Sequence, residues 1–289
     1  MAAPATANPD STTDKPPRAR RWIPLSLRMF VAMLVLLGAG SAFWVGVPAW
    51  QQHSAIREIE RAGGELETKP TAPKWVRDRI GDERTRMLDE AAAVILHGSQ
   101  ATDGVLSQVR RLPNLKRINL TDTPITAAGL HHLQGLTLLE NLSLGDTQIT
   151  DAGLAHLQRL TRLEVLYLYN THVTDAGLSH LRGLNRLRFL YLKRTHVTDA
   201  GLIHLQSLSH LEVLSLDDTQ VTDRGLLHLQ ELPSLQMLYL RNTQVSDRGL
   251  VHLKALTRLA CLYLENAQVT DAGIAELKTA LPRLRTFVK

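Results

Sequence analysis

Residues 160–183 read LTRLEVLYLYNTHVTDAGLSHLRG, and this pattern recurs every 24 residues along the chain. Seven copies begin at Leu112, Leu136, Leu160, Leu184, Leu208, Leu232 and Leu256. We call each copy a coil and number the coils 1 to 7 from the N-terminal side. A fixed period of this length predicts a solenoid, in which each coil buries its apolar side chains against its neighbours.

Each coil contains a segment with a period of two, followed by a helical segment. In coil 3, apolar and exposed positions alternate over residues 165–169, which predicts a short strand with one buried face. Thr174 and Asp175 offer side-chain oxygens that can cap a helix, and the leucines of residues 178–184 follow at helical spacing. Stacked coils therefore predict an α/β solenoid, with a parallel sheet on a concave side and short helices on the outside.

The sequence next to the seven coils predicts a cap at each end of the stack. Residues 88–111 form a degenerate repeat, in which Val94 and Leu106 fall on apolar positions of coil 1 when the sequence is shifted by 24 residues. We therefore expect an N-terminal capping repeat there, seven repeats over 112–279, and a C-terminal cap over 280–289 that begins one more strand before the chain end cuts it short.

The N-terminal part differs from the repeats. Residues 1–21 lack an apolar period and are predicted to be a disordered tail. Residues 22–50 are predicted to be a transmembrane signal anchor, because Met29 to Val47 is a run of 19 residues without a charge. Residues 51–87 are predicted to form a juxtamembrane neck, which is either a spacer or a partly folded cap.

The charge around the apolar run predicts its orientation. Five basic residues against two acidic ones lie in the first 50 residues, on the N-terminal side of the run. The positive-inside rule then predicts a cytoplasmic N-terminus and extracytoplasmic repeats in a single-pass membrane protein. Small residues near the end of the run leave a cleaved signal peptide as an alternative. Gly38 and Ala42 form a small-xxx-small pair, which predicts at most weak self-association of membrane helices.

Composition argues against several classes of function. The net charge is +5, but the N-terminal 50 residues hold most of the excess positive charge. The repeats therefore lack the basic stripe that would predict nucleic-acid binding. Cys261 is the only cysteine, which excludes an intramolecular disulfide. We find no nucleophile with a base, no paired carboxylates, no metal-ligand spacing and no phosphate loop, and we therefore expect neither an enzyme nor a cofactor.

The repeat unit L-x-x-L-x-L-x-x-T-x-V-T-D-x-G-L-x-H-L resembles the leucine-rich repeats of bacterial proteins, in the helix-bearing style of ribonuclease-inhibitor-like repeats. A basic tail, an apolar segment and the neck sequence IREIERAGG at residues 56–64 resemble a membrane-anchored group of them. The resemblance implies a non-catalytic binding protein. Similar repeats also form the substrate-binding arm of F-box ubiquitin-ligase adaptors, although no F-box-like helical block precedes the repeats here.

Four residue types recur once per coil and are interpreted as structural. We expect the threonines at 123, 147, 171, 195, 219 and 243 to bond turn backbone in adjacent coils, and the glycines at 129 to 273 to allow close approach of helices. The histidines at 132, 156, 180, 204, 228 and 252 are expected to bond the next coil's backbone rather than a metal, because helices pack about 8–10 Å apart. The aspartates at 151 to 271 are expected to cap helices.

The exposed strand positions vary from coil to coil and carry all five tyrosines of the chain. Tyrosine and arginine are enriched at protein interfaces, so we predict that this face binds another protein. The predicted contact residues are Tyr167, Tyr169, Phe189, Tyr191, Lys193, Tyr239, Arg241 and Tyr263. An envelope carbohydrate that stacks on the same tyrosines is the alternative, as is a simple preference of tyrosine for strands.

Overall fold

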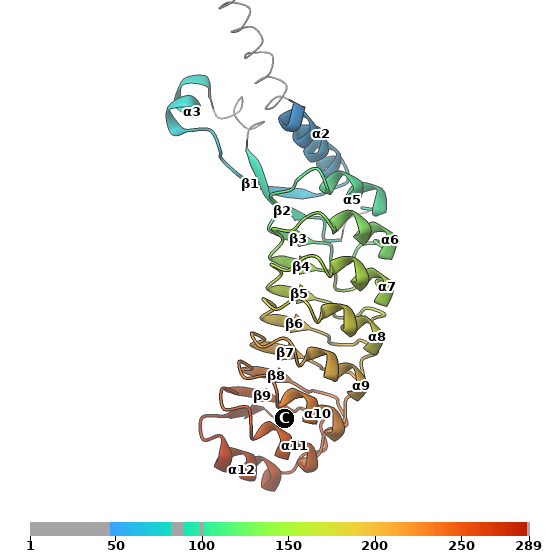
Figure 1. Ribbon diagram of the computed structural model, residues 1–289, viewed down its shortest axis with the longest axis vertical. Coiled ribbons are helices and arrows are strands. Elements are labelled where there is room, and N and C mark those ends of the chain that lie inside the picture. The colour runs from blue at the N-terminus through green and yellow to red at the C-terminus, as the bar shows by residue number, and fades with distance from the viewer. Residues whose placement is uncertain (1–46, 82–88, 99–100, 288–289) are drawn as a thin grey trace, which may run out of the picture. The chain divides into compact units, whose positions relative to one another are not determined.

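The computed structural model describes residues 47–81, 89–98 and 101–287. In the unit that begins at Pro48, ten strands form one sheet, and they follow one another across the sheet in chain order. The strands lie along one side of this stack and the helices of the coils along the other (Figure 1). This arrangement of repeated strands and helices matches a leucine-rich-repeat solenoid, as the period predicted.

The strands are short, and one strand belongs to each coil. Their bounds are β1 Glu65–Lys69, β2 Glu90–Ile95, β3 Arg117–Asn119, β4 Asn141–Ser143, β5 Val165–Tyr167, β6 Phe189–Tyr191, β7 Val213–Ser215, β8 Met237–Tyr239, β9 Cys261–Tyr263 and β10 Arg285–Phe287. From β2 to β10 all neighbours pair in parallel. Val165 pairs with Phe189 and Tyr167 with Tyr191, so equivalent positions of successive coils lie side by side.

The helices are also short, because each has to fit within one turn of the solenoid. Their bounds are α2 Val47–Arg61, α3 Lys74–Ile80, α5 Asp103–Val109, α6 Ala127–Leu130, α7 Asp151–Leu154, α8 Asp175–Leu178, α9 Asp199–Leu202, α10 Asp223–Leu229, α11 Asp247–Leu253 and α12 Asp271–Ala280. One turn of 3-10 helix continues each of α6 to α9, at His131–Leu133, Ala155–Leu157, Ser179–Leu181 and Ile203–Leu205.

The core is a continuous column of leucines between the strands and the helices. Leu166 and Leu168 of β5 and the following turn are fully buried, as are Leu178 and Leu181 on the helical side. Nearly every coil repeats this pattern, so each coil covers the apolar side of the next. Burial of these side chains drives the fold, because removing apolar surface from water contributes about 25 cal/mol per Å².

The segment before the repeats packs onto the first end of this column. β1 pairs with β2 in antiparallel orientation, in contrast to the parallel pairing of the other strands. Ala55 and Ile59 of α2 are fully buried and belong to the same apolar cluster as the repeats. The described part of the predicted neck therefore covers the open end of the solenoid, which favours the cap over the spacer.

An Asp, a Thr and a Gly form the joint between successive coils. Asp151 begins α7, and its two carboxylate oxygens accept hydrogen bonds from the backbone N–H (2.8 Å) and the hydroxyl (2.7 Å) of Thr174 in the next coil. Gly177 lies against the same carboxylate, and a Cβ at Gly177 would overlap Asp151 Oδ1. The predicted role of the aspartates as caps is wrong in part: Thr174 caps its helix, and Asp151 joins two coils.

Asp103, which precedes coil 1, joins Thr126 of that coil with the same atoms, and four further joints within the seven coils repeat this geometry. The pairs are Asp175–Thr198, Asp199–Thr222, Asp223–Ser246 and Asp247–Thr270, and each acidic residue accepts both hydrogen bonds. The glycine beside each of these aspartates has no room for a side chain because the carboxylate fills that space. We expected close helices to explain the glycines, and the observed reason is this carboxylate.

The joint between coils 1 and 2 lacks the acid. Ala127 occupies the place of the aspartate, and Thr150, which follows it in coil 2, makes no side-chain capping bond. A Cβ at Gly153 would lie 3.1 Å from its nearest neighbours, Ile149 and Leu130. This joint is therefore a natural counterpart of the others, with a glycine present but without its carboxylate.

The hydroxyls of the buried threonines donate hydrogen bonds within their own coil and not to the adjacent one. The Thr147 hydroxyl donates to the Leu144 carbonyl at 2.6 Å, and Thr171 does the same to Leu168 at 2.7 Å. The expectation that these hydroxyls bond adjacent coils is therefore wrong. Each threonine closes the turn that follows its strand, where an unpaired carbonyl would cost about 1–3 kcal/mol.

The predicted membrane segment, Met29 to Val47, lies outside the described residues except for its last position. Among the residues that the structure describes, no helix has the length and apolar character needed to cross a bilayer.

Candidate functional site

The exposed side of the sheet, which we call the sheet face, carries three rows of side chains. The middle row comes from the last residue of each short strand and contains Asn119, Ser143, Tyr167, Tyr191, Ser215, Tyr239, Tyr263 and Phe287. The parallel register places these positions directly beside one another, one strand apart. All eight predicted contact residues lie on the sheet face, in this row or in the rows that flank it.

The tyrosines of the middle row stack in two groups. Tyr167 and Tyr191 lie nearly parallel with their ring centroids 4.6 Å apart. Tyr239 and Tyr263 stack at 4.3 Å, and Phe287 continues this group at 4.4 Å. The spacing matches the distance of about 4.8 Å between neighbouring strands, so the strand register itself generates the stacks.

The other predicted residues surround these groups. Tyr169 meets Tyr167 edge to face at 6.4 Å, with its ring over Gly145. The Arg188 guanidinium lies over the ring of Phe189 at 5.2 Å. The structure thus brings six of the eight residues into two neighbouring aromatic groups, and it leaves Phe189 and Lys193 in the flanking rows.

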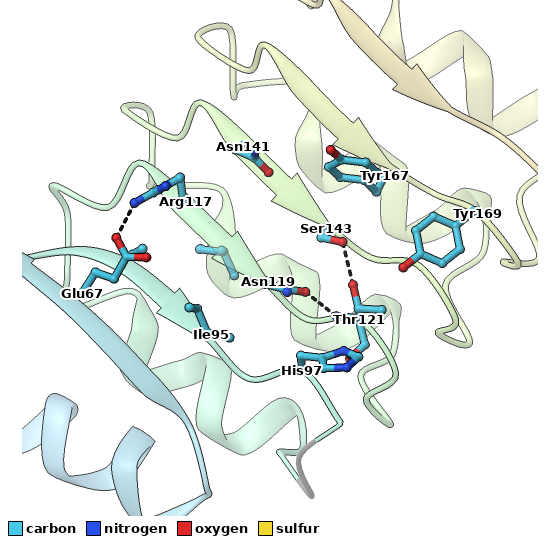
Figure 2. Close-up of a pocket in the computed structure, with 12 residues that line it drawn as sticks. Glu67, Ile95, His97, Arg117, Asn119, Thr121, Asn141, Ser143, Tyr167 and Tyr169 are labelled. Atoms are coloured by element: carbon cyan, nitrogen blue, oxygen red, sulfur yellow. Dashed lines mark hydrogen bonds and ion pairs between the residues drawn. The ribbon is translucent and has the colours of Figure 1, made fainter. Parts of the chain in front are cut away.

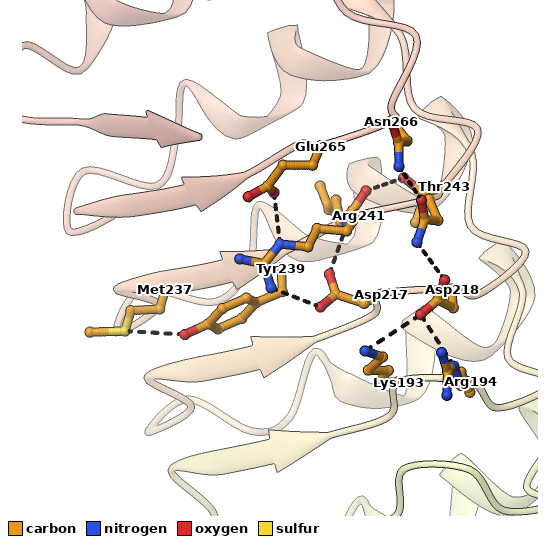
Figure 3. A network of polar contacts seen from close by, with 12 residues as sticks. Lys193, Arg194, Asp217, Asp218, Met237, Tyr239, Arg241, Thr243, Glu265 and Asn266 are labelled. Carbon is orange, nitrogen blue, oxygen red and sulfur yellow. Dashed lines mark hydrogen bonds and ion pairs between the residues drawn. The ribbon is translucent and has the colours of Figure 1, made fainter. Parts of the chain in front are cut away.

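Arg241 holds the second group together (Figure 3). Its guanidinium carbon lies 4.6 Å from the centroid of Tyr263 and 5.5 Å from that of Tyr239. Arg241 Nε donates to Glu265 Oε2 at 2.7 Å, and Nη1 lies 3.6 Å from Asp217 Oδ2. The hydrogen bond to Glu265 is the main reason why the pKa of Arg241 is raised.

Asp217 is the most deeply buried acid that borders this group. Its side chain accepts a hydrogen bond from the backbone N–H of Arg241 at 2.8 Å, and the residue is only 3% exposed. Burial raises the pKa of Asp217 above its ordinary value, and the nearby Arg241 opposes that rise. Beside it, Asp218 lies 3.7 Å from Lys193 Nζ, so the positive charges here are paired.

Ser215 interrupts the tyrosine row between the two aromatic groups. It lies between Tyr191 and Tyr239 in the register and leaves a hollow of about 260 Å³ bordered by Tyr191, Ser215, Asp217 and Tyr239. Burial raises the pKa of both tyrosine hydroxyls, and a neighbouring tyrosine adds to the shift in each case. Both hydroxyls therefore remain protonated and uncharged at neutral pH.

A second, larger hollow of about 450 Å³ lies over β1, β2 and coils 1 to 3 (Figure 2). Its lining includes apolar side chains of β2 and β3 together with a polar part, in which the hydroxyls of Thr121 and Ser143 lie 2.6 Å apart and the Asn119 side chain accepts from the Thr121 N–H. Tyr167 and Tyr169 border it on one side. An ion pair between Arg117 and Glu67 links β3 to the segment before the repeats.

Three of the six histidines in the column, His156, His180 and His204, bond side chains of the preceding coil and not backbone of the next. His156 Nδ1 lies 2.6 Å from Gln134 Nε2, and His180 Nδ1 lies 2.6 Å from Gln158 Nε2. His204 makes the same contact with Arg182, and burial lowers its pKa. Within the described ranges, no group of three or more His, Cys, Asp or Glu side chains is placed to hold a metal ion.

Two features of the site were not identified from the sequence. Phe287 extends the tyrosine row, and its place in the row could have been found by continuing the 24-residue register past Tyr263. The burial of Asp217 could not be predicted, because the equivalent position is partly exposed in coils 3, 4, 6 and 7 and is buried only where it carries an uncharged residue, Thr121 or Gly145.

Comparisons with known proteins agree with this architecture. Residues 207–229 match the family model described as "Leucine Rich repeat". The solved structure of internalin C2 from Listeria monocytogenes is 26% identical and has a TM-score of 0.57, over 68% of this chain and 80% of that chain. A Listeria monocytogenes internalin, InlF, is 21% identical over 63% of this chain and 69% of that chain, with a TM-score of 0.42.

A comparison with curated proteins finds no match. The fold is typical of domains that bind other proteins and of non-catalytic scaffolds. The matched repeat, the 24-residue register and the likeness to internalin C2 together show that residues of this chain form a leucine-rich-repeat solenoid.

Proposed function

We propose that this chain is a membrane-anchored, non-catalytic binding protein whose sheet face binds another protein outside the cytoplasm. The observation that carries the proposal is the pair of aromatic groups on the sheet face, with Arg241 across the second of them. Tyrosine and arginine contribute strongly to binding because they offer large, rigid contact area together with polar atoms.

The distribution of structural roles supports the same face. On the helical side the repeated Asp, Thr and Gly residues form joints between most of the coils. On the sheet face most of the aromatic and charged side chains remain partly exposed, so a partner could bind them without disrupting the solenoid. The uncharged run Met29 to Val47 and the basic residues before it support the membrane anchor and its orientation.

Site-specific photo-crosslinking in intact cells tests this function. A photoreactive phenylalanine analogue at Tyr191 or Tyr239 should yield adducts with one defined protein. The matched control places the same analogue at Ile203 or Val251, which are exposed on the helical side. Adducts only from Ile203 and Val251, or none from the sheet face, would overturn the proposal.

The carbohydrate alternative rests on a different observation, the larger hollow over coils 1 to 3. The hydroxyl and amide groups in its polar part, beside Tyr167 and Tyr169, have the chemistry that saccharides use for hydrogen bonding and ring stacking. Pelleting of the purified chain with cell-wall material, lost in an Asn119→Ala, Ser143→Ala double variant, would favour this function. Unchanged pelleting in that variant would exclude the hollow as the saccharide site.

A further inference from the structure

The place of Ser215 in the tyrosine row has the dimensions of one missing ring. On the C-terminal side, Tyr239, Tyr263 and Phe287 occupy three successive strands, and their rings follow one another at 4.3 and 4.4 Å. Tyr191 and Tyr239 are likewise two strands apart, with Ser215 on the strand between them. Two strand steps separate their backbones by about 9.6 Å, which is twice a normal stacking distance.

Both rings border this space. Tyr191 stacks on Tyr167 with the two ring planes 9° apart, and Tyr239 stacks on Tyr263 with the two ring planes 4° apart. The stacking partner of each ring lies on the strand farther from Ser215, and both rings line the hollow of about 260 Å³ beside Ser215.

The charges around the hollow are paired within the chain. Arg241 bonds Glu265 at 2.7 Å and lies 3.6 Å from Asp217, while Lys193 and Arg194 lie 3.7 and 3.6 Å from Asp218. Three positive and three negative side chains therefore compensate one another here. This balance suits an uncharged occupant better than an ion, because an added charge would find no unpaired counter-charge.

The rings on either side of the hollow favour a flat ring as its occupant. A planar ring placed midway would lie roughly 4.8 Å from each tyrosine, inside the range in which aromatic rings stack. A saturated ring also has room there, but it lacks the π-system through which aromatic rings attract one another beyond burial of their area. Geometry and charge therefore favour a flat, neutral ring.

We infer that the space above Ser215, between Tyr191 and Tyr239, receives one aromatic side chain of the bound protein, which completes the row of stacked rings. This inference rests on the proposed function, since the side chain comes from the partner. A protein supplies such a ring better than a free small molecule does, because the rest of the partner can then contact the flanking rows of the sheet face.

Filling the space from within the chain tests the inference. Ser215→Tyr should place a ring between Tyr191 and Tyr239, as Tyr263 already lies between Tyr239 and Phe287. Val251→Tyr is the control: it adds an exposed ring on the helical side, away from the sheet face. Binding of N-acetyl-tryptophanamide to the purified full chain is followed by ligand-observed NMR.

We expect saturable binding with a Kd of roughly millimolar strength in the wild type and in Val251→Tyr, and at least tenfold weaker binding in Ser215→Tyr. None of the three proteins should bind another probe more tightly than the tryptophan probe. The other probes are N-acetyl-cyclohexylalanine amide, N-acetyl-arginine amide and methyl β-glucoside. Equal binding of the tryptophan probe by the wild type and Ser215→Tyr, or tighter binding of any of the other three probes, would overturn the inference.

Crosslinking separates failure of this inference from failure of the proposed function. Adducts from Tyr239 together with no saturable binding of the tryptophan probe would refute the aromatic site and leave protein binding by the sheet face intact. Adducts from Tyr239 that disappear in Ser215→Tyr and persist in Val251→Tyr would support both. Absence of adducts from every sheet-face position would refute protein binding by the sheet face, and the inference would then be refuted as well.

Discussion

The helical side and the sheet face use the same 24-residue period in opposite ways. On the helical side, the same three residue types recur in nearly every coil, and each makes a defined contact with the next coil. On the sheet face, the residue type changes from coil to coil, and the contacts change with it: tyrosines stack in coils 3, 4, 6 and 7, and Arg241 bonds residues of the two coils beside its own. Within one chain, repetition thus indicates a structural joint and variation indicates a surface available for binding.

The largest effect should follow from adding one methyl group to a joint. Gly177→Ala places a Cβ on Asp151 Oδ1 and at 3.2 Å from Leu154 Cδ1. Such overpacking costs about 1–3 kcal/mol of stability. We expect the free energy of unfolding to fall by about 2 kcal/mol, as measured from the midpoint of urea unfolding. Gly153→Ala is the control, since the preceding coil carries Ala127; a loss there as large as that of Gly177→Ala would contradict the carboxylate explanation.

Removal of an acid should be next in size. Asp175→Ala deletes the hydrogen bonds to the N–H (2.8 Å) and hydroxyl (2.6 Å) of Thr198. Loss of these bonds should lower the free energy of unfolding by about 1–2 kcal/mol. The exposed Glu231, which is outside the joints, is the control position, and Glu231→Ala should change stability by less than about 0.5 kcal/mol. Equal effects of the two variants would indicate that the acid contributes nothing as a joint.

Supplying the missing acid should stabilise the one joint that lacks it. Ala127→Asp would place a carboxylate beside Gly153 and within the geometry that the other coils use to bond the next threonine, here Thr150. We expect a gain of about 0.5–1 kcal/mol, measured by the same urea unfolding. The gain should vanish when Thr150 is replaced by Ala, and destabilisation by Ala127→Asp would show that coil 1 cannot accept the common geometry.

The smallest effect concerns the buried acid of the sheet face. The pKa of Asp217 is raised in the folded chain, so the folded state retains its proton at a higher pH than the unfolded state does. The wild type should therefore gain stability relative to Asp217→Asn as the pH falls, in a window that lies above the ordinary carboxyl value of 3.8. A stability difference that does not change with pH, or changes in the opposite direction, would contradict this.

The fold could be predicted because period, strand alternation and helical spacing all point to one architecture. The contacts of the repeated side chains could not be predicted from the sequence. Asp, Thr, Gly and His recur at fixed positions, and a period alone does not say whether a side chain reaches its own turn, as Thr147 does, or the neighbouring coil, as Asp151 and His156 do. That distinction depends on ångström-scale geometry between coils.

The sheet face could be predicted in position but not in arrangement. The sequence placed Tyr167, Tyr191, Tyr239 and Tyr263 in one row because strand side chains alternate. It also showed the interruption at Ser215. The nearly parallel stacking on both sides of that interruption, and hence a space of one ring, depends on rotamers that the pattern does not encode.

Binding by the sheet face is most directly tested with the partner protein that crosslinking identifies. The purified partner is titrated against two matched double variants of this chain. Tyr191→Ala with Tyr239→Ala should weaken its binding at least tenfold and leave the urea midpoint nearly unchanged, because both rings are partly exposed. Leu227→Ala with Val251→Ala, at exposed positions of the helical side, should leave the affinity unchanged. Full affinity in the tyrosine variant, or a loss confined to the helical-side variant, would contradict the account.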